Sequence, residues 1–76
     1  MADQTIQQRF NQMLLERVRA DPFPSLEHMN LFEATVRDPD QLVEYLEILM
    51  EKVESTHFPS LSLLKRIQRI AAQLPA

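Results

Sequence analysis

A four-residue phrase, FPSL, occurs twice in this chain and limits what the chain can fold into. It spans Phe23–Leu26 and returns at Phe58–Leu61, 35 residues later. At the same offset, the 17 positions of Phe10–Leu26 align with Tyr45–Leu61 and include seven identities. Ordinary residue frequencies would give roughly one identity. The sequence therefore predicts two copies of one helix–turn–helix unit.

The composition favours helices throughout the chain. There are 76 residues and no glycine, a residue that hairpin turns and phosphate loops usually need. Good helix formers dominate, and β-branched residues are few and scattered. We therefore expect one all-α domain over 1–76, with four short helices in two tandem hairpins, repeat 1 at about 5–37 and repeat 2 at about 38–74. Both a small closed bundle and a solenoid-like array fit this pattern.

Local chemistry marks where each helix should begin and end. Each apolar segment follows a residue whose side chain can accept a backbone N–H at a helix N-terminus. The predicted N-caps are Thr5 or Asp3, Ser25, Asp38 and Ser60, and the helices should end near Ala20, near Val36 or Arg37, near Ser55 and near Gln73. Gln41 lies three residues after Asp38, at the position that closes a capping box. Pro22 and Pro24 should stop the first helix, and Pro75 the last.

The spacing of apolar residues predicts which faces are buried. In the first helix the expected inward residues are Ile6, Phe10, Met13, Leu14 and Val18. In the fourth helix they are Leu61, Leu64, Ile67, Ile70, Ala71 and Leu74. Phe23 and Phe58 stand beside the proline turns and are expected in the core, because large apolar residues at a tight turn usually pack inward.

The repeated unit resembles a tetratricopeptide-type repeat in its length and its helix–turn–helix form. Asp38-Pro39 opens one copy and Leu74-Pro75 closes it. The characteristic Trp, Leu-Gly and Tyr of that repeat are missing, and two copies are fewer than the three that solenoids usually need. The resemblance implies only stacked α-hairpins, whose common use is to hold another chain.

No arrangement of side chains in the sequence points to catalysis or to a bound metal. His28 and His57 are not equivalent under the repeat, there is no cysteine, and a metal site needs three or four converging ligands. The acidic stripe of the third helix consists of Glu44, Glu47, Glu51 and Glu54. A stripe opposite an apolar face is normally solvated rather than catalytic. We therefore expect a protein that is not an enzyme and that carries no cofactor.

Lys65, Arg66 and Arg69 make the fourth helix basic, although the whole chain has a net charge of −3. One interpretation is a contact with nucleic acid, but three basic residues are few for a surface that binds phosphates. The other, which we favour, is that this helix partly neutralises the acidic third helix.

Leu15 and Met50 are equivalent under the repeat, and both lie off the main apolar stripe of their helices. Val43 extends that second stripe on the third helix. A helix that is apolar on two sides must pack on both or expose a patch. Packing between the two hairpins would explain the pair, and so would a partner, either a second copy or a different protein.

These observations predict a small interaction module or adaptor with an unidentified protein partner. The alternatives are nucleic-acid binding through the fourth helix and homodimerisation. No apolar run approaches ~20 residues, the length that a membrane span needs, and residues 1–12 contain no apolar core of a signal peptide. We therefore expect a cytoplasmic protein without a membrane span.

Overall fold

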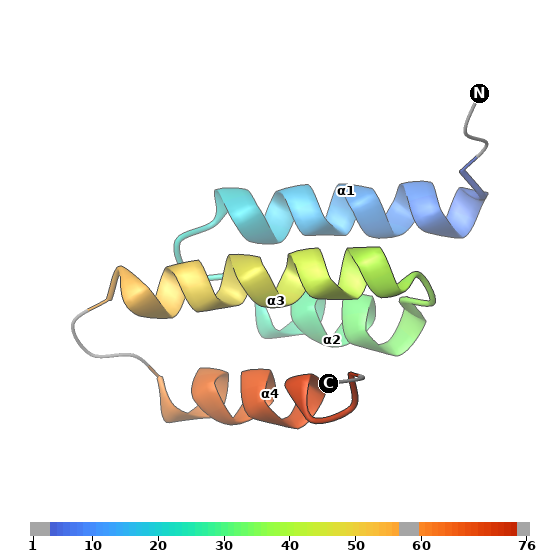
Figure 1. The fold of residues 1–76 in the computed structure, drawn as a ribbon. Helices are drawn as coiled ribbons and strands as arrows, with labels where there is room; N and C mark the ends of the chain where they lie inside the picture. The colour runs from blue at the N-terminus through green and yellow to red at the C-terminus, as the bar shows by residue number, and fades with distance from the viewer. Residues whose placement is uncertain (1–3, 57–59, 75–76) are drawn as a thin grey trace. The chain divides into compact units, whose positions relative to one another are not determined.

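The computed structural model describes residues 4–56 and 60–74, and the regular secondary structure of these residues is α-helix (Figure 1). The four helices are α1 (Ile6–Ala20), α2 (Leu26–Thr35), α3 (Pro39–Glu54) and α4 (Leu61–Ala71). The predicted all-α class with four short helices is therefore confirmed. Asp3, His57, Phe58, Pro59 and Pro75 lie outside the described residues, and so do the predictions made for them.

Three of the predicted helix starts are confirmed by the hydrogen bonds of their capping side chains. Thr5 and Gln8 form a reciprocal capping box, in which Thr5 Oγ1 accepts from the Gln8 N–H at 3.0 Å and Gln8 Oε1 accepts from the Thr5 N–H at 2.9 Å. Ser25 Oγ accepts from the backbone N–H groups of residues 27 and 28. Ser60 Oγ accepts from the N–H of Leu63 at 3.3 Å. Each bond satisfies a donor that the first helical turn leaves without an intrahelical partner.

The fourth start differs from its prediction in one respect. Asp38 Oδ1 accepts from the Asp40 N–H at 2.9 Å and so caps α3. Gln41 does not close a capping box, and that prediction is wrong. Its side-chain Nε2 instead donates to the backbone oxygen of Gln8 at 2.9 Å and to Gln12 Oε1 at 3.4 Å. Gln41 is buried, so its amide bonds to α1 rather than to the end of its own helix.

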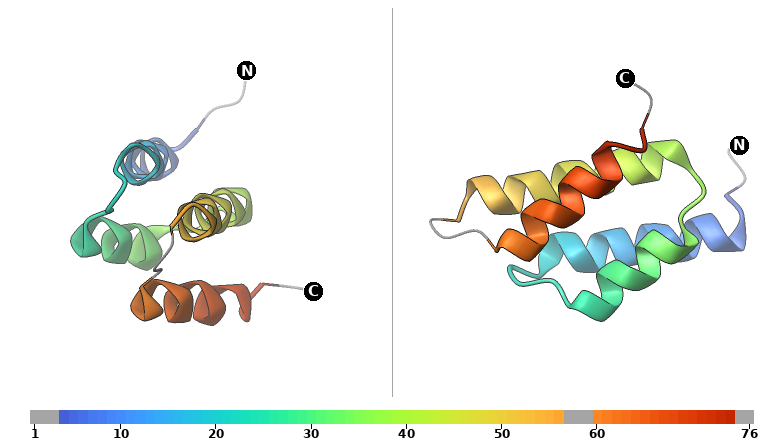
Figure 2. Two further views of the ribbon diagram at one scale, coloured as in Figure 1. Left: turned by 90° about the vertical axis from the view of Figure 1, so that its left-hand side faces the viewer. Right: turned by 90° about the horizontal axis from the view of Figure 1, so that it is seen from below.

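The chain divides into two compact units, Met1–Val43 and Glu44–Ala76. The first unit contains α1, α2 and the first turn of α3, so its boundary falls later than the predicted repeat boundary between residues 37 and 38. In each unit the second helix runs back in the opposite sense to the first (Figure 2). The buried apolar residues of the first unit are Leu14, Leu15, Val18, Met29 and Phe32, and those of the second are Tyr45, Leu46, Ile48, Leu49 and Ile70.

The helices α2 and α4 begin 35 residues apart, as the repeat requires. Their N-caps have nearly the same backbone conformation, with φ −62° and ψ 135° at Ser25 and φ −65° and ψ 129° at Ser60. No residue in the described part of the chain has a positive φ. The repeat itself stays a prediction, since burial at aligned positions differs.

The face that α1 buries is rotated from the predicted one. Leu14 and Val18 are buried as expected, together with Asn11 and Leu15. The prediction that three further residues face inward is wrong: Ile6, Phe10 and Met13 are 77%, 37% and 49% exposed. Leu15 lies two residues after Met13 and therefore about 200° away around the helix. The helix cannot direct both residues into one core.

Two other predictions of burial are corrected. Phe23 is 85% exposed, in the turn between α1 and α2 where its backbone N–H donates to Asp21 Oδ1 at 2.9 Å. On α4, Ile70 is buried as predicted, whereas Leu61, Leu64 and Ala71 are exposed. The first turn of α4 therefore contributes less to the core than its apolar spacing indicates.

The caps give a direct test of the local chemistry. We expect Ser25→Ala and Ser60→Ala each to lower the free energy of unfolding by about 0.5–2 kcal/mol, because each change leaves a backbone N–H without its acceptor. Urea denaturation followed by circular dichroism measures this loss. Ser62→Ala is the matched control, since Ser62 is exposed inside α4 and should change stability by no more than about 0.5 kcal/mol. A cap variant as stable as the control would show that the serine does not stabilise that helix.

Candidate functional site

One side of α3 carries exposed apolar residues. Val43 and Met50 are 43% and 42% exposed. They are seven residues apart, which places them within about 20° of each other around the helix. Exposed carboxylates stand beside them. We call this set the α3 surface, and it consists of Val43, Glu47, Met50, Glu51 and Glu54.

Leu15 does not share the exposure of Met50, its equivalent under the repeat. Its side chain is 0% exposed, among the core residues of α1. The predicted partner surface of Leu15, Val43 and Met50 is therefore not presented as a whole. Leu15 is a packing residue, while Val43 and Met50 remain available on α3.

A second exposed apolar face lies on α1 and was missed in the sequence. Ile6, Phe10 and Met13 follow one another at spacings of four and three residues, so they form a continuous stripe. Arg9 and Arg17 are exposed on the same side of the helix. We call these five residues the α1 surface. The sequence contained evidence for this exposed stripe, because Leu15 and Met13 cannot both face one core. The stripe was nevertheless predicted to be buried.

The basic residues of α4 do not lie together on its exposed side. Lys65 and Arg69 are exposed and one turn apart, whereas Arg66 is 9% exposed. Arg66 is therefore mostly buried as a residue, and both Arg66 and Arg69 take part in interactions within the protein. This arrangement leaves a weaker cationic surface than three exposed charges would give.

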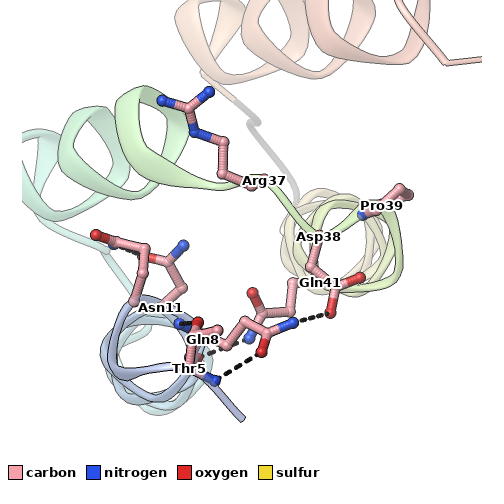
Figure 3. A pocket seen from close by; sticks show the side chains of 8 residues that line it. Thr5, Gln8, Asn11, Arg37, Asp38, Pro39 and Gln41 are labelled. Carbon is pink, nitrogen blue, oxygen red and sulfur yellow. Dashed lines mark hydrogen bonds between the residues drawn. The ribbon is translucent and has the colours of Figure 1, made fainter.

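A pocket of about 440 Å³ lies beside the starts of α1 and α3 (Figure 3). Its lining consists of Thr5, Gln7, Gln8, Asn11, Arg37, Asp38, Pro39 and Gln41. The Gln41 side chain extends from α3 toward α1, and the Gln8 side chain extends toward Asp38 (Figure 3). Gln41 Oε1 is buried and has no hydrogen-bond partner among the described residues. A buried acceptor of this kind is ordinarily satisfied by a water molecule or by another donor.

Asn11 forms the buried polar contact between α1 and α2. Its Nδ2 donates to the backbone oxygen of Thr35 at 3.3 Å, and its Oδ1 accepts from Thr35 Oγ1 at 3.0 Å. Oδ1 also accepts from Gln7 Nε2 at 3.0 Å. These bonds pair the amide on both sides, which allows a polar side chain to be only 1% exposed.

The remaining candidates for chemistry lie apart from one another. His28 is exposed and lines a shallow pocket of about 330 Å³ with Arg17, Ala20, Asp21 and Pro22. Within residues 4–56 and 60–74, no three histidines or carboxylates are placed to hold a metal ion. In the same part of the chain, no helix combines the length and the apolar character needed to cross a membrane.

The Asn11 contact can be tested through stability. We expect Asn11→Ala to lower the free energy of unfolding by about 1–3 kcal/mol, because it removes the side-chain donor of the Thr35 carbonyl, while the Thr35 hydroxyl keeps its bond to the Leu31 backbone oxygen at 2.7 Å. Thermal and urea denaturation both measure the effect. Gln68→Ala, an exposed change inside α4, serves as the control and should stay within about 0.5 kcal/mol of the unmodified protein. Equal stability of the two variants would contradict a structural role for Asn11.

Three features therefore distinguish the described surface: the α1 surface, the α3 surface and the amide-lined pocket. The first two carry exposed apolar residues beside charges of opposite sign, and the third is lined in part by amide side chains. No protein-family model matches the chain, and no curated protein and no solved structure is significantly similar to it.

Proposed function

We propose that the protein is a small non-enzymatic interaction module that binds a protein partner through the α3 surface. The observation that carries this proposal is the exposure of Val43 and Met50, two turns apart along one side of a helix whose opposite face is buried. An apolar centre within a charged margin is the usual anatomy of a protein-binding patch. Methionine suits such a patch, because its flexible, polarisable side chain adapts to different partners.

The rigidity of α3 supports this proposal. Tyr45, Ile48 and Leu49 are buried on the side of α3 away from Val43 and Met50, and Leu46 is buried at the edge between the two sides. Their packing fixes the rotation of the helix, so the α3 surface is already formed before a partner arrives. A preformed surface loses little side-chain and backbone freedom on binding, which favours affinity.

The charge of the α3 surface indicates the kind of partner. Glu47, Glu51 and Glu54 give it an acidic margin. A complementary partner would offer an amphipathic helix with apolar residues in the middle and Lys or Arg beside them. Nucleic acid fits less well, because its phosphates would be repelled here and because Arg66 on α4 is mostly buried.

The proposal includes a cytoplasmic location. A chain without cysteine needs no oxidising compartment for its folding.

The test is capture of partners from a nuclease-treated native lysate, with mass spectrometry as the readout. We expect a recurrent protein bound by the unmodified chain and lost with Val43→Ser/Met50→Ser, since the pair supplies the apolar centre. Leu26→Ser/Leu31→Ser is the matched control, because these two α2 residues are at least as exposed but lie outside the α3 surface. The captured protein should bind the α3 variant at least about tenfold more weakly. Equal recovery by the two variants would contradict the proposal.

A further inference from the structure

We propose that the α3 surface of one copy of this protein binds the α1 surface of another copy, in a head-to-tail contact. This inference rests on the proposed function and names the partner as a second copy of the chain. The contact joins two different faces, so it is heterologous rather than symmetric.

The two surfaces match in shape and in kind. The α1 surface presents Ile6, Phe10 and Met13 at successive turns along one side of a helix, and the α3 surface presents Val43 and Met50 two turns apart along one side of another. On each helix the five residues of the surface fall within an arc of about 100°. Two such stripes can pack against each other as neighbouring helices do, with apolar side chains in the middle and charges at the margins.

The charges determine which surfaces can meet. Arg9 and Arg17 flank the α1 surface, and the one glutamate beside them, Glu16, is paired with Arg19 at 3.6 Å. The margin of the α3 surface is formed by glutamates, among them Glu47 and Glu54. Two α1 surfaces would bring arginines together, and two α3 surfaces would bring glutamates together. Like charges across an interface are unfavourable, while opposite charges guide and orient the encounter. The combination of α1 with α3 is therefore the favoured one.

Burial at aligned positions gives an independent reason. Phe10 and Met13 are exposed, but the residues aligned with them 35 positions later, Tyr45 and Ile48, are buried. The opposite holds at Met50, which is exposed and aligns with the buried Leu15. The face that one helix exposes thus corresponds to a face that the other helix buries. Each surface therefore exposes apolar residues whose aligned counterparts on the other helix are buried.

The size of the surfaces sets the expected strength. With five apolar side chains in all, the contact falls in the class below about 1,200 Å², where association is weak and transient. Its charges are exposed, so salt should weaken it further, since the screening length is about 10 Å at 0.1 M. We therefore expect self-association that appears only at high protein concentration and low salt.

The experiment is sedimentation velocity on the full chain between about 10 µM and about 1 mM. The average mass of the unmodified protein should rise with concentration and should return toward the monomer value in about 0.5 M salt. Arg9→Glu/Arg17→Glu should remain monomeric, and Glu47→Lys/Glu54→Lys should do the same, because each variant presents two surfaces of like charge. Arg9→Lys/Arg17→Lys keeps the charge and should still associate.

An equimolar mixture of the two reversed variants is the decisive sample. In the mixture each acidic face meets a basic one again, so association should return, and its return also shows that both variants are folded. A monomeric unmodified protein at about 1 mM would overturn the inference, and so would a mixture that stays monomeric. If the protein is monomeric but Val43→Ser/Met50→Ser still abolishes capture of another protein, self-association fails and the interaction module stands.

Discussion

The hydrogen bonds of two buried amides decide how α1 is turned in the first unit. Asn11 bonds to Thr35 at the end of α2, and Gln41 bonds to the backbone of Gln8. A buried amide without partners would cost stability, so rotations of α1 that break these contacts are disfavoured. Apolar packing alone tolerates many arrangements of leucines, whereas these bonds select one.

The exposure of the α1 surface follows from that selection. Once Asn11 is turned inward, Leu14, Leu15 and Val18 accompany it, and the stripe that begins at Ile6 must face outward. The structure also shows that the arginines of α1 lie beside exposed apolar residues, which the sequence alone does not show. Arginines that would merely keep a surface soluble instead stand beside three exposed apolar side chains. On α3 the buried residues likewise fix the rotation of the helix, so Val43 and Met50 face outward beside the glutamates of the α3 surface.

Helix positions and caps were predictable from the sequence because they depend on neighbours along the chain. Thr5, Ser25 and Ser60 act within three residues of themselves, and proline acts on the residue before it. The buried faces were less predictable, since apolar periodicity assigns amides such as Asn11 to the surface. Aligned residues such as Leu15 and Met50 have similar neighbours in the sequence but different neighbours in the folded protein. Only the structure therefore shows that Leu15 is buried and Met50 is exposed.

The turns of this protein affect its stability through the unfolded chain. In the part of the chain that the structure describes, no residue has a positive φ, and the turn sequences contain prolines and capping side chains without a glycine anywhere in the sequence. Each glycine avoided where the backbone allows it removes disordered conformations, an effect worth about 0.4–1 kcal/mol, and prolines act in the same sense. A chain of 76 residues has a small core and no disulfide to support it. Its unfolded chain therefore has less conformational entropy to lose on folding, so less stabilisation from core packing is needed for the chain to fold.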